Sequence, residues 1–124
     1  MALAASVIAV DDGPAFLDVL RKVVAATPGL TIVAEASSGE RAVELVEQMR
    51  PDLVVMDVRM PGIGGVGASQ QIKAAHPATI VVLISSCSAE DLPAETDGSE
   101  ADAVICKRDL RPALLAGLLQ RHSP

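Results

Sequence analysis

The sequence of 124 residues contains one aromatic residue, Phe16, and neither tryptophan nor tyrosine. A hydrophobic core must therefore be aliphatic, built from the Ala, Val, Leu and Ile in which the chain is rich. No apolar run approaches the ~20 residues that a membrane-spanning helix needs. The chain also lacks the basic start and long apolar segment of a secretion signal. We therefore expect a cytoplasmic location and no membrane partner.

Cysteine and basic residues are also scarce. The two cysteines, Cys87 and Cys106, do not have the spacing of metal ligands. Acidic residues outnumber basic ones by 16 to 10, which gives a formal net charge of −6. This charge argues against nucleic acid or an anionic membrane as the main partner of this stretch. The length, with no repeat or linker, predicts a single domain over residues 1–124.

Short apolar segments and helical patterns alternate along the chain. Strands are expected at residues 6–10, 30–36, 53–56, 80–84 and 103–106. Helices are expected to begin at Pro14, after a capping box of Ser37 and Glu40, near Val66, and at Pro112. The second helix should turn Val43, Val46 and Met49 inward. Five alternations imply βαβ units with right-handed crossovers, hence an α/β protein with a doubly wound, five-stranded parallel sheet.

The segment between the last two expected strands is an exception. The fold requires a helix there, but Pro93 would remove a helical hydrogen bond and Gly98 weakens whatever follows. We therefore expect this helix to be short or irregular, and the segment from Ala89 to Ala101 to be the most mobile part of the domain.

Polar residues follow four of the five strands. Asp11 and Asp12 follow the first, Asp57 the third, Ser85 the fourth and Lys107 the fifth. Parallel strands all end at one edge of the sheet, where α/β proteins bind ligands, so these side chains should converge there. Each residue alone also has an ordinary explanation as a helix cap, a turn residue, a backbone hydrogen bond or a solvated charge. A complementary set at four strand ends is harder to obtain by chance.

Charge indicates what such a site can do. Three neighbouring carboxylates repel one another, and a hard divalent cation relieves the repulsion. Mg²⁺ suits one or two protein carboxylates, with water and a phosphate oxygen completing its shell. Asp57 is then a candidate nucleophile that attacks phosphorus and forms an acyl phosphate. Lys107 can hold one phosphoryl oxygen and the Ser85 hydroxyl can donate to another.

Four segments resemble the motifs of the receiver domain of bacterial two-component response regulators, and their order and spacing along the chain are also similar. These segments are VIAVDDGP, VVMDVRMPG, VVLISS and VICKRDL. The resemblance covers residues 6–119. It implies a flavodoxin-like (CheY-like) fold, (βα)5 with strand order 2-1-3-4-5. The DDGP and KRDL segments are most similar to the branch that precedes a LuxR/NarL-type helix-turn-helix output domain. Contact with DNA is therefore expected only through a domain that these 124 residues do not contain.

The resemblance also implies roles at the acidic end of the sheet. It makes Asp57 the phosphoacceptor. Asp11 and Asp12 become acidic residues of the Mg²⁺ site, and the backbone carbonyl of Arg59 becomes a further metal ligand. Mg²⁺ is thus the implied cofactor, held together with Asp57 itself.

Further roles fall on the fourth and fifth strands. The resemblance implies Ser85 as the switch hydroxyl, Lys107 as the phosphoryl contact, and the small Ser86 as the residue that lets phosphate enter. Val104 stands where the family has an aromatic signalling lever, and Gly64 stands where it usually has Asp. We therefore expect the signal to travel as ordering of the segment after Ser85 rather than as rotation of a ring.

Two classes of function compete, with a third behind them. The first is a phosphorylation-controlled switch, not an enzyme beyond its own phosphorylation and dephosphorylation. It would take its phosphoryl group from a sensor histidine kinase and change a face that binds a partner or a second copy. Through the absent output domain, this change is expected to control transcription. The second is a pseudo-receiver that only binds other proteins, against which the intact Asp12, Asp57, Ser85 and Lys107 argue. The third is a metal-dependent hydrolase, which lacks a second Asp at general-acid spacing and a histidine near the site.

Overall fold

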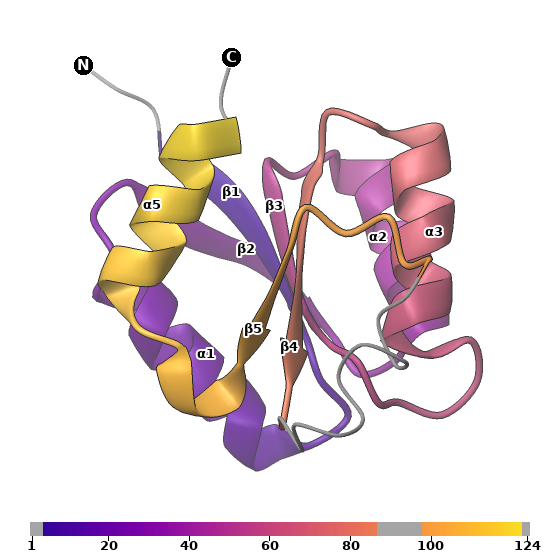
Figure 1. The fold of residues 1–124 in the computed structure, drawn as a ribbon, viewed down its shortest axis with the longest axis horizontal. Coiled ribbons are helices and arrows are strands. Elements are labelled where there is room, and N and C mark those ends of the chain that lie inside the picture. Colours follow the sequence, from indigo (N-terminus) through magenta and orange to yellow (C-terminus); the bar gives the residue numbers. More distant parts are fainter. Residues whose placement is uncertain (1–3, 87–97, 123–124) are drawn as a thin grey trace.

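The structure is a computed structural model that describes residues 4–86 and 98–122. Five strands form one sheet: β1 (Ala5–Val10), β2 (Leu30–Ala36), β3 (Leu53–Asp57), β4 (Ile80–Ser85) and β5 (Ala103–Cys106). All neighbours pair in parallel, in the order β2-β1-β3-β4-β5 (Figure 1). The expected doubly wound, five-stranded parallel sheet with order 2-1-3-4-5 is confirmed.

Helices cover both faces of the sheet. They are α1 (Pro14–Ala25), α2 (Gly39–Met49), α3 (Gly64–Ala75) and α5 (Pro112–His122), with a 3₁₀ turn at Lys107–Asp109. Helices α1 and α5 lie on one face, and α2 and α3 lie on the other (Figure 1). Within the described ranges, no helix has the length and apolar character to cross a membrane. The irregular helix expected before β5, in the mobile segment from Ala89 to Ala101, lies outside the described residues except for residues 98–101.

The core is aliphatic, as expected from the single aromatic residue. Every residue of β3 and β4 is buried, which is typical of central parallel strands covered on both faces. One apolar cluster lies under α2 and α3 and includes Ile8, Val46, Met56 and Ile72. The other lies under α1 and α5 and includes Leu20, Leu53, Leu115 and Leu118. The two clusters fix the sheet between its helices.

Helix α2 begins one residue later than expected. Its N-cap is Ser38, whose side chain accepts a hydrogen bond from the backbone N–H of Arg41 at 3.1 Å. The capping box predicted between Ser37 and Glu40 is therefore wrong, because the residue three positions after the true cap is Arg41 and cannot return the bond. Met49, predicted to point inward, is 43% exposed. The buried residues of this helix are Gly39, Ala42, Leu45 and Val46.

Strand β5 pairs with β4, and a side chain of α3 holds the residue that precedes it. Lys73 Nζ donates to the carbonyl oxygens of Pro77 and Thr79, both at 2.8 Å, and to Asp102 Oδ2 at 2.9 Å. The same Asp102 oxygen accepts from the N–H of Val81 in β4 at 2.8 Å. These bonds hold the residue that precedes β5 against α3 and the start of β4.

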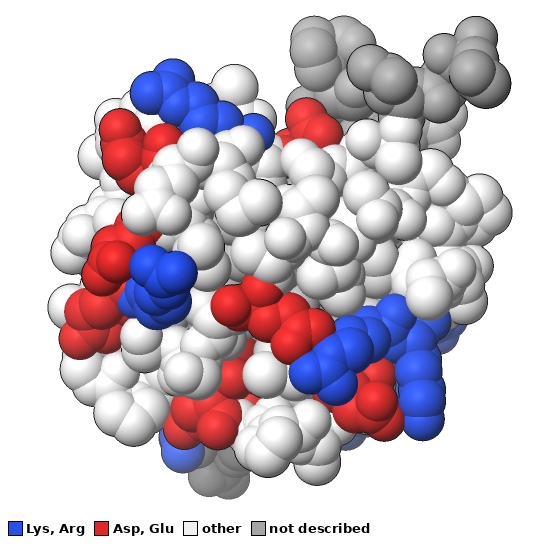
Figure 2. All heavy atoms as spheres, turned by 180° about the vertical axis from the view of Figure 1, so that it is seen from behind, with Lys and Arg blue, Asp and Glu red and all other residues white. Residues whose placement is uncertain are grey.

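Acidic and basic side chains are mixed on the surface. Figure 2 shows the face opposite to that of Figure 1, where red and blue groups lie next to one another and uncharged surface fills much of the area between them. Ion pairs of this kind join Arg21 to Glu35 at 2.5 Å and Arg41 to Glu44 at 3.0 Å. This face has no broad basic area of the sort that would attract nucleic acid.

Helix α3 begins at Gly64, two residues before the expected start near Val66. Gly65 lies against the end of β3, and its N–H donates to the Val58 carbonyl at 3.0 Å. A Cβ on Gly65 would collide with the carbonyl oxygen of Asp57 and lie 2.9 Å from Cα of Val58. The absence of a side chain at Gly65 therefore lets the first turn of α3 rest directly on the backbone that carries Asp57.

The close approach at Gly65 predicts opposite effects for two glycine-to-alanine exchanges. Gly65→Ala should lower the free energy of unfolding by ~1–3 kcal/mol, because backbone must move to admit the methyl group. Gly117→Ala in α5, where a Cβ meets nothing within 4 Å, should raise it by ~0.5–1 kcal/mol through better helix propensity. Urea unfolding measures both. Equal stabilisation by the two variants would contradict the contact.

Candidate functional site

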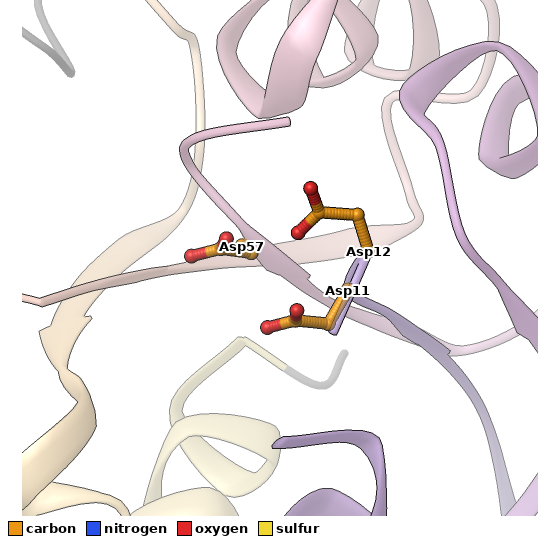
Figure 3. Close-up of side chains that lie close together, drawn as sticks. All are labelled: Asp11, Asp12 and Asp57. Atoms are coloured by element: carbon orange, nitrogen blue, oxygen red, sulfur yellow. The ribbon is translucent and has the colours of Figure 1, made fainter. Parts of the chain in front are cut away.

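Three carboxylates meet at the carboxyl end of the sheet. Asp11 and Asp12 directly follow β1, and Asp57 ends β3. Strands β1 and β3 are neighbours, and the pairing of Val10 with Met56 brings Asp11 level with Asp57. One oxygen from each of the three side chains lies within 4.8 Å of the others (Figure 3). Among the described residues, this is the group that could hold a metal ion.

The two oxygens of Asp11 have different surroundings. Its side chain is buried, and Oδ1 accepts a hydrogen bond from the N–H of Gly13 at 2.7 Å. Oδ2 is buried and accepts no hydrogen bond from the described part of the chain. A buried carboxylate oxygen without a hydrogen bond costs free energy, which a bound cation would recover. The donor set, three carboxylates and no nitrogen or sulfur, matches what Mg²⁺ accepts.

Burial and like charge change the acidity of Asp57. The residue is 8% exposed. Its burial, followed by the charge of Asp11 and then by that of Asp12, raises the pKa of Asp57 from 3.8 to about 6, although the Lys107 ammonium opposes the rise. The exposed Asp12 therefore matters less to Asp57 than the buried Asp11 does.

Lys107 supplies the positive charge of the site from the end of β5. Its Nζ lies 3.6 Å from Asp11 Oδ2 and 3.7 Å from Asp57 Oδ1. Both distances are too long for direct hydrogen bonds, so the ammonium acts on the two carboxylates by charge. One ammonium facing three carboxylates leaves an excess of negative charge, which favours a further cation.

The remaining predicted residues surround this cluster. Ser85 ends β4 and is 2% exposed, and the next residue, Ser86, is exposed. Arg59 is exposed in the loop two residues after Asp57. Val104 lies in β5, half-buried against the apolar cluster under α2 and α3. The structure thus brings Asp11, Asp12, Asp57 and Lys107 into one cluster; the predicted roles of all these residues stay predictions.

The sequence analysis missed one residue at the site. Phe16 is given no role at the site by the sequence analysis, yet Lys107 Nζ lies 4.3 Å from the centre of its ring. Two signals could have suggested it: Phe16 is the one aromatic residue in the chain, and it stands four residues after Asp12, in the first turn of α1.

His76 lies away from the cluster. It follows α3, and its Nε2 is 2.6 Å from Glu47 Oε2. Strand β4 starts four residues later and runs from there towards the site. His76 therefore links the ends of α2 and α3 at the opposite edge of the sheet and offers no general acid or base to the carboxylates.

A parallel α/β domain with strand order 2-1-3-4-5 and an acidic cluster at the carboxyl ends of β1 and β3 has the architecture of a CheY-like receiver. The chain belongs to the response regulator receiver domain family, whose model matches residues 7–118.

Individual relatives agree with this family. The chain is 36% identical over 87 residues to "Response regulator GacA" of Pseudomonas viridiflava, covering 70% of this chain and 41% of that protein. It is 37% identical over 98 residues to a protein-glutamate methylesterase/protein-glutamine glutaminase of Geobacter metallireducens, covering 79% of this chain and 28% of that protein. The chain thus spans less than half the length of either relative.

A solved structure extends the comparison. A LuxR-family two-component response regulator from Aurantimonas sp. SI85-9A1 superposes with a TM-score of 0.81 at 27% identity, covering 95% of this chain and 84% of that one. The expected likeness to receivers of the LuxR branch is confirmed. Receivers found in methylesterases are similarly close in sequence.

The raised pKa of Asp57 predicts how its replacement changes stability. The pKa of Asp57 is about 6 in the folded state and 3.8 ordinarily, so the folded state binds this proton more tightly than the unfolded chain does. The ionised Asp57 therefore destabilises the metal-free fold at pH 7. This destabilisation decreases as the pH falls from about 6 towards 3.8. Asp57→Asn should therefore raise the free energy of unfolding at pH 7. The shift sets an upper limit of ~3 kcal/mol, which screening by water and ions lowers to ~1–2 kcal/mol.

Urea unfolding in chelator at pH 7 and pH 5 measures this effect. The gain from Asp57→Asn should shrink at the lower pH, where the wild-type carboxyl is largely protonated. Glu100→Gln removes one exposed negative charge before β5, at the edge of the sheet opposite to the cluster, and is the control. A gain no larger than that of the control would show that the cluster is not repulsive.

Proposed function

We propose that this domain is a phosphorylation-controlled signalling switch, in which Asp57 takes a phosphoryl group from the phosphohistidine of a sensor histidine kinase in a Mg²⁺-dependent reaction. One observation carries the proposal: the Asp57 carboxylate is buried beside two further carboxylates, with the Lys107 ammonium 3.7 Å from its Oδ1. Membership of the receiver family supports it.

Asp11, Asp12 and Asp57 would hold the Mg²⁺, together with the backbone carbonyl of Arg59. The buried Oδ2 of Asp11, which accepts no hydrogen bond from the described residues, supports this assignment. When bound, Mg²⁺ supplies positive charge that lets an anionic phosphoryl group approach three carboxylates. Asp12, exposed at the rim of the cluster, leaves one side of the site open to water.

In the reaction, a carboxylate oxygen of Asp57 forms a bond to phosphorus while the bond from phosphorus to the donor's imidazole nitrogen breaks, and the product is an acyl phosphate. Lys107 contacts one phosphoryl oxygen by charge. Ser85, buried at the end of the neighbouring strand β4, donates its hydroxyl to another, and the small exposed Ser86 leaves the entrance clear. Water attacking the acyl phosphate returns the domain to its first state.

The consequence of phosphorylation lies beyond this chain's own chemistry. The domain acts as a cytoplasmic switch and not as an enzyme for other substrates. It changes the affinity of one face for a partner or a second copy of the chain, and it controls transcription through a DNA-binding domain outside these 124 residues.

Intact mass spectrometry tests the phosphoacceptor. The domain incubated with acetyl phosphate and Mg²⁺ should gain the mass of one phosphoryl group, and chelator should prevent the gain. Asp57→Asn should abolish it, since an amide has nearly the same shape but is no nucleophile. Labelling of the Asn variant would refute the assignment, and a wild-type protein that stays unlabelled would instead indicate an interaction module without phosphorylation.

Asp12 should matter for metal binding and little for stability. Asp12→Ala should weaken Mg²⁺ binding, because one of three charged ligands is lost. It should raise the stability of the metal-free fold, but by less than ~0.5 kcal/mol, since the side chain is exposed. Mg²⁺ titration calorimetry and thermal melts in chelator measure the two effects. Unchanged Mg²⁺ affinity would exclude Asp12 from the metal site.

A further inference from the structure

Lys107 has three neighbours of two different kinds. Its Nζ lies 3.6 Å from Asp11 Oδ2, 3.7 Å from Asp57 Oδ1 and 4.3 Å from the centre of the Phe16 ring. The carboxylates come from the ends of β1 and β3, and the ring comes from the first turn of α1. The ammonium at the end of β5 is therefore held between three separate elements of the fold.

The two kinds of neighbour respond differently to a cation. The attraction of the carboxylates for Lys107 depends on their negative charge, which a bound Mg²⁺ would largely neutralise. The attraction of the ring comes from its quadrupole, acts on an ammonium within about 6 Å of the centroid and does not depend on the charge of Asp11 or Asp57. The ring is thus the neighbour whose hold on Lys107 persists when the carboxylates bind metal.

We propose that Phe16 is a positioning residue for Lys107: its ring keeps the ammonium at the site while the acidic cluster is occupied by a cation. The effect of this contact on function rests on the proposed phosphorylation of Asp57. A Lys107 side chain that turns into solvent cannot contact the incoming phosphoryl oxygen. The side chain of Lys107 is 32% exposed, so solvent is open to it.

A simpler role for Phe16 is apolar filling, since its ring also packs beside the aliphatic cluster under α1 and α5. Two substitutions separate these roles. Phe16→Leu keeps apolar contact and removes the ring, whereas Phe16→Tyr keeps a ring in the same place. Filling alone predicts that Leu serves as well as Phe, and positioning predicts that only Tyr does.

Proton NMR can observe the contact directly, without phosphorylation. The chain has three lysines, Lys22, Lys73 and Lys107, and neither Trp nor Tyr, so a ring-current shift of the Lys107 ε-methylene that disappears in Phe16→Leu can be traced to Phe16 and not to the imidazoles of His76 or His122. In protein with ¹³C-labelled lysine, the Lys107 signal should lie upfield of the other two and stay there when Mg²⁺ is added. The shift should vanish in Phe16→Leu and remain in Phe16→Tyr. A Lys107 signal that moves to the position of the exposed Lys22 on addition of Mg²⁺ would refute the proposal.

Phosphorylation rates with acetyl phosphate at saturating Mg²⁺ test the consequence. Phe16→Leu should slow labelling by ~3–10-fold, which is the rate equivalent of a cation–π contact. Phe16→Tyr should be labelled at the rate of the wild type. In a Lys107→Ala background, Phe16→Leu should cause no further loss, because the ring acts through Lys107. Equal slowing in both backgrounds would assign Phe16 a purely structural role. If the wild type takes up no phosphoryl group at all, the proposed function fails, while the NMR result still decides whether Phe16 holds Lys107.

Discussion

The parallel pairing of β1 with β3 is the constraint on which the site depends. Both strands end at the same edge of the sheet in matched register, so Asp11 and Asp57 lie close together although their negative charges repel. Burial and, after it, the charge of Asp11 raise the pKa of Asp57, and Asp11 Oδ2 accepts no hydrogen bond from the described residues. Two aliphatic clusters, one on each face of the sheet, supply the burial that offsets this cost. The fold is thus stable around a site that is unfavourable without a cation.

Much of this arrangement could be predicted from the sequence, since it rests on strong local patterns. Buried parallel strands read as continuous apolar runs, so β3 and β4 were placed within one residue of their ends. A parallel sheet then decides by topology alone which strand ends meet. Asp11, Asp12, Asp57 and Lys107 were therefore expected together, and the structure places them so.

The errors arose where neighbouring alternatives have similar energies or where contacts are distant in sequence. Ser37 and Ser38 are equally good caps in isolation, and the choice between them depends on which hydroxyl reaches the N–H of Arg41. Composition does not reveal why Gly65 lacks a side chain, because the backbone it meets belongs to β3. The contact of Phe16 with Lys107 joins the first helix to the last strand, and no local pattern encodes it.

The contact of Gly65 with the end of β3 also has a thermodynamic consequence. Because the first turn of α3 rests on the backbone of Asp57 and Val58, a molecule that binds this turn and a group that modifies Asp57 act on the same few backbone atoms. If binding favours one position of those atoms, modification must favour or oppose it by the same free energy. The two events are then linked in both directions. A ligand of α3 would change how readily Asp57 is modified, and modification of Asp57 would change the affinity for that ligand.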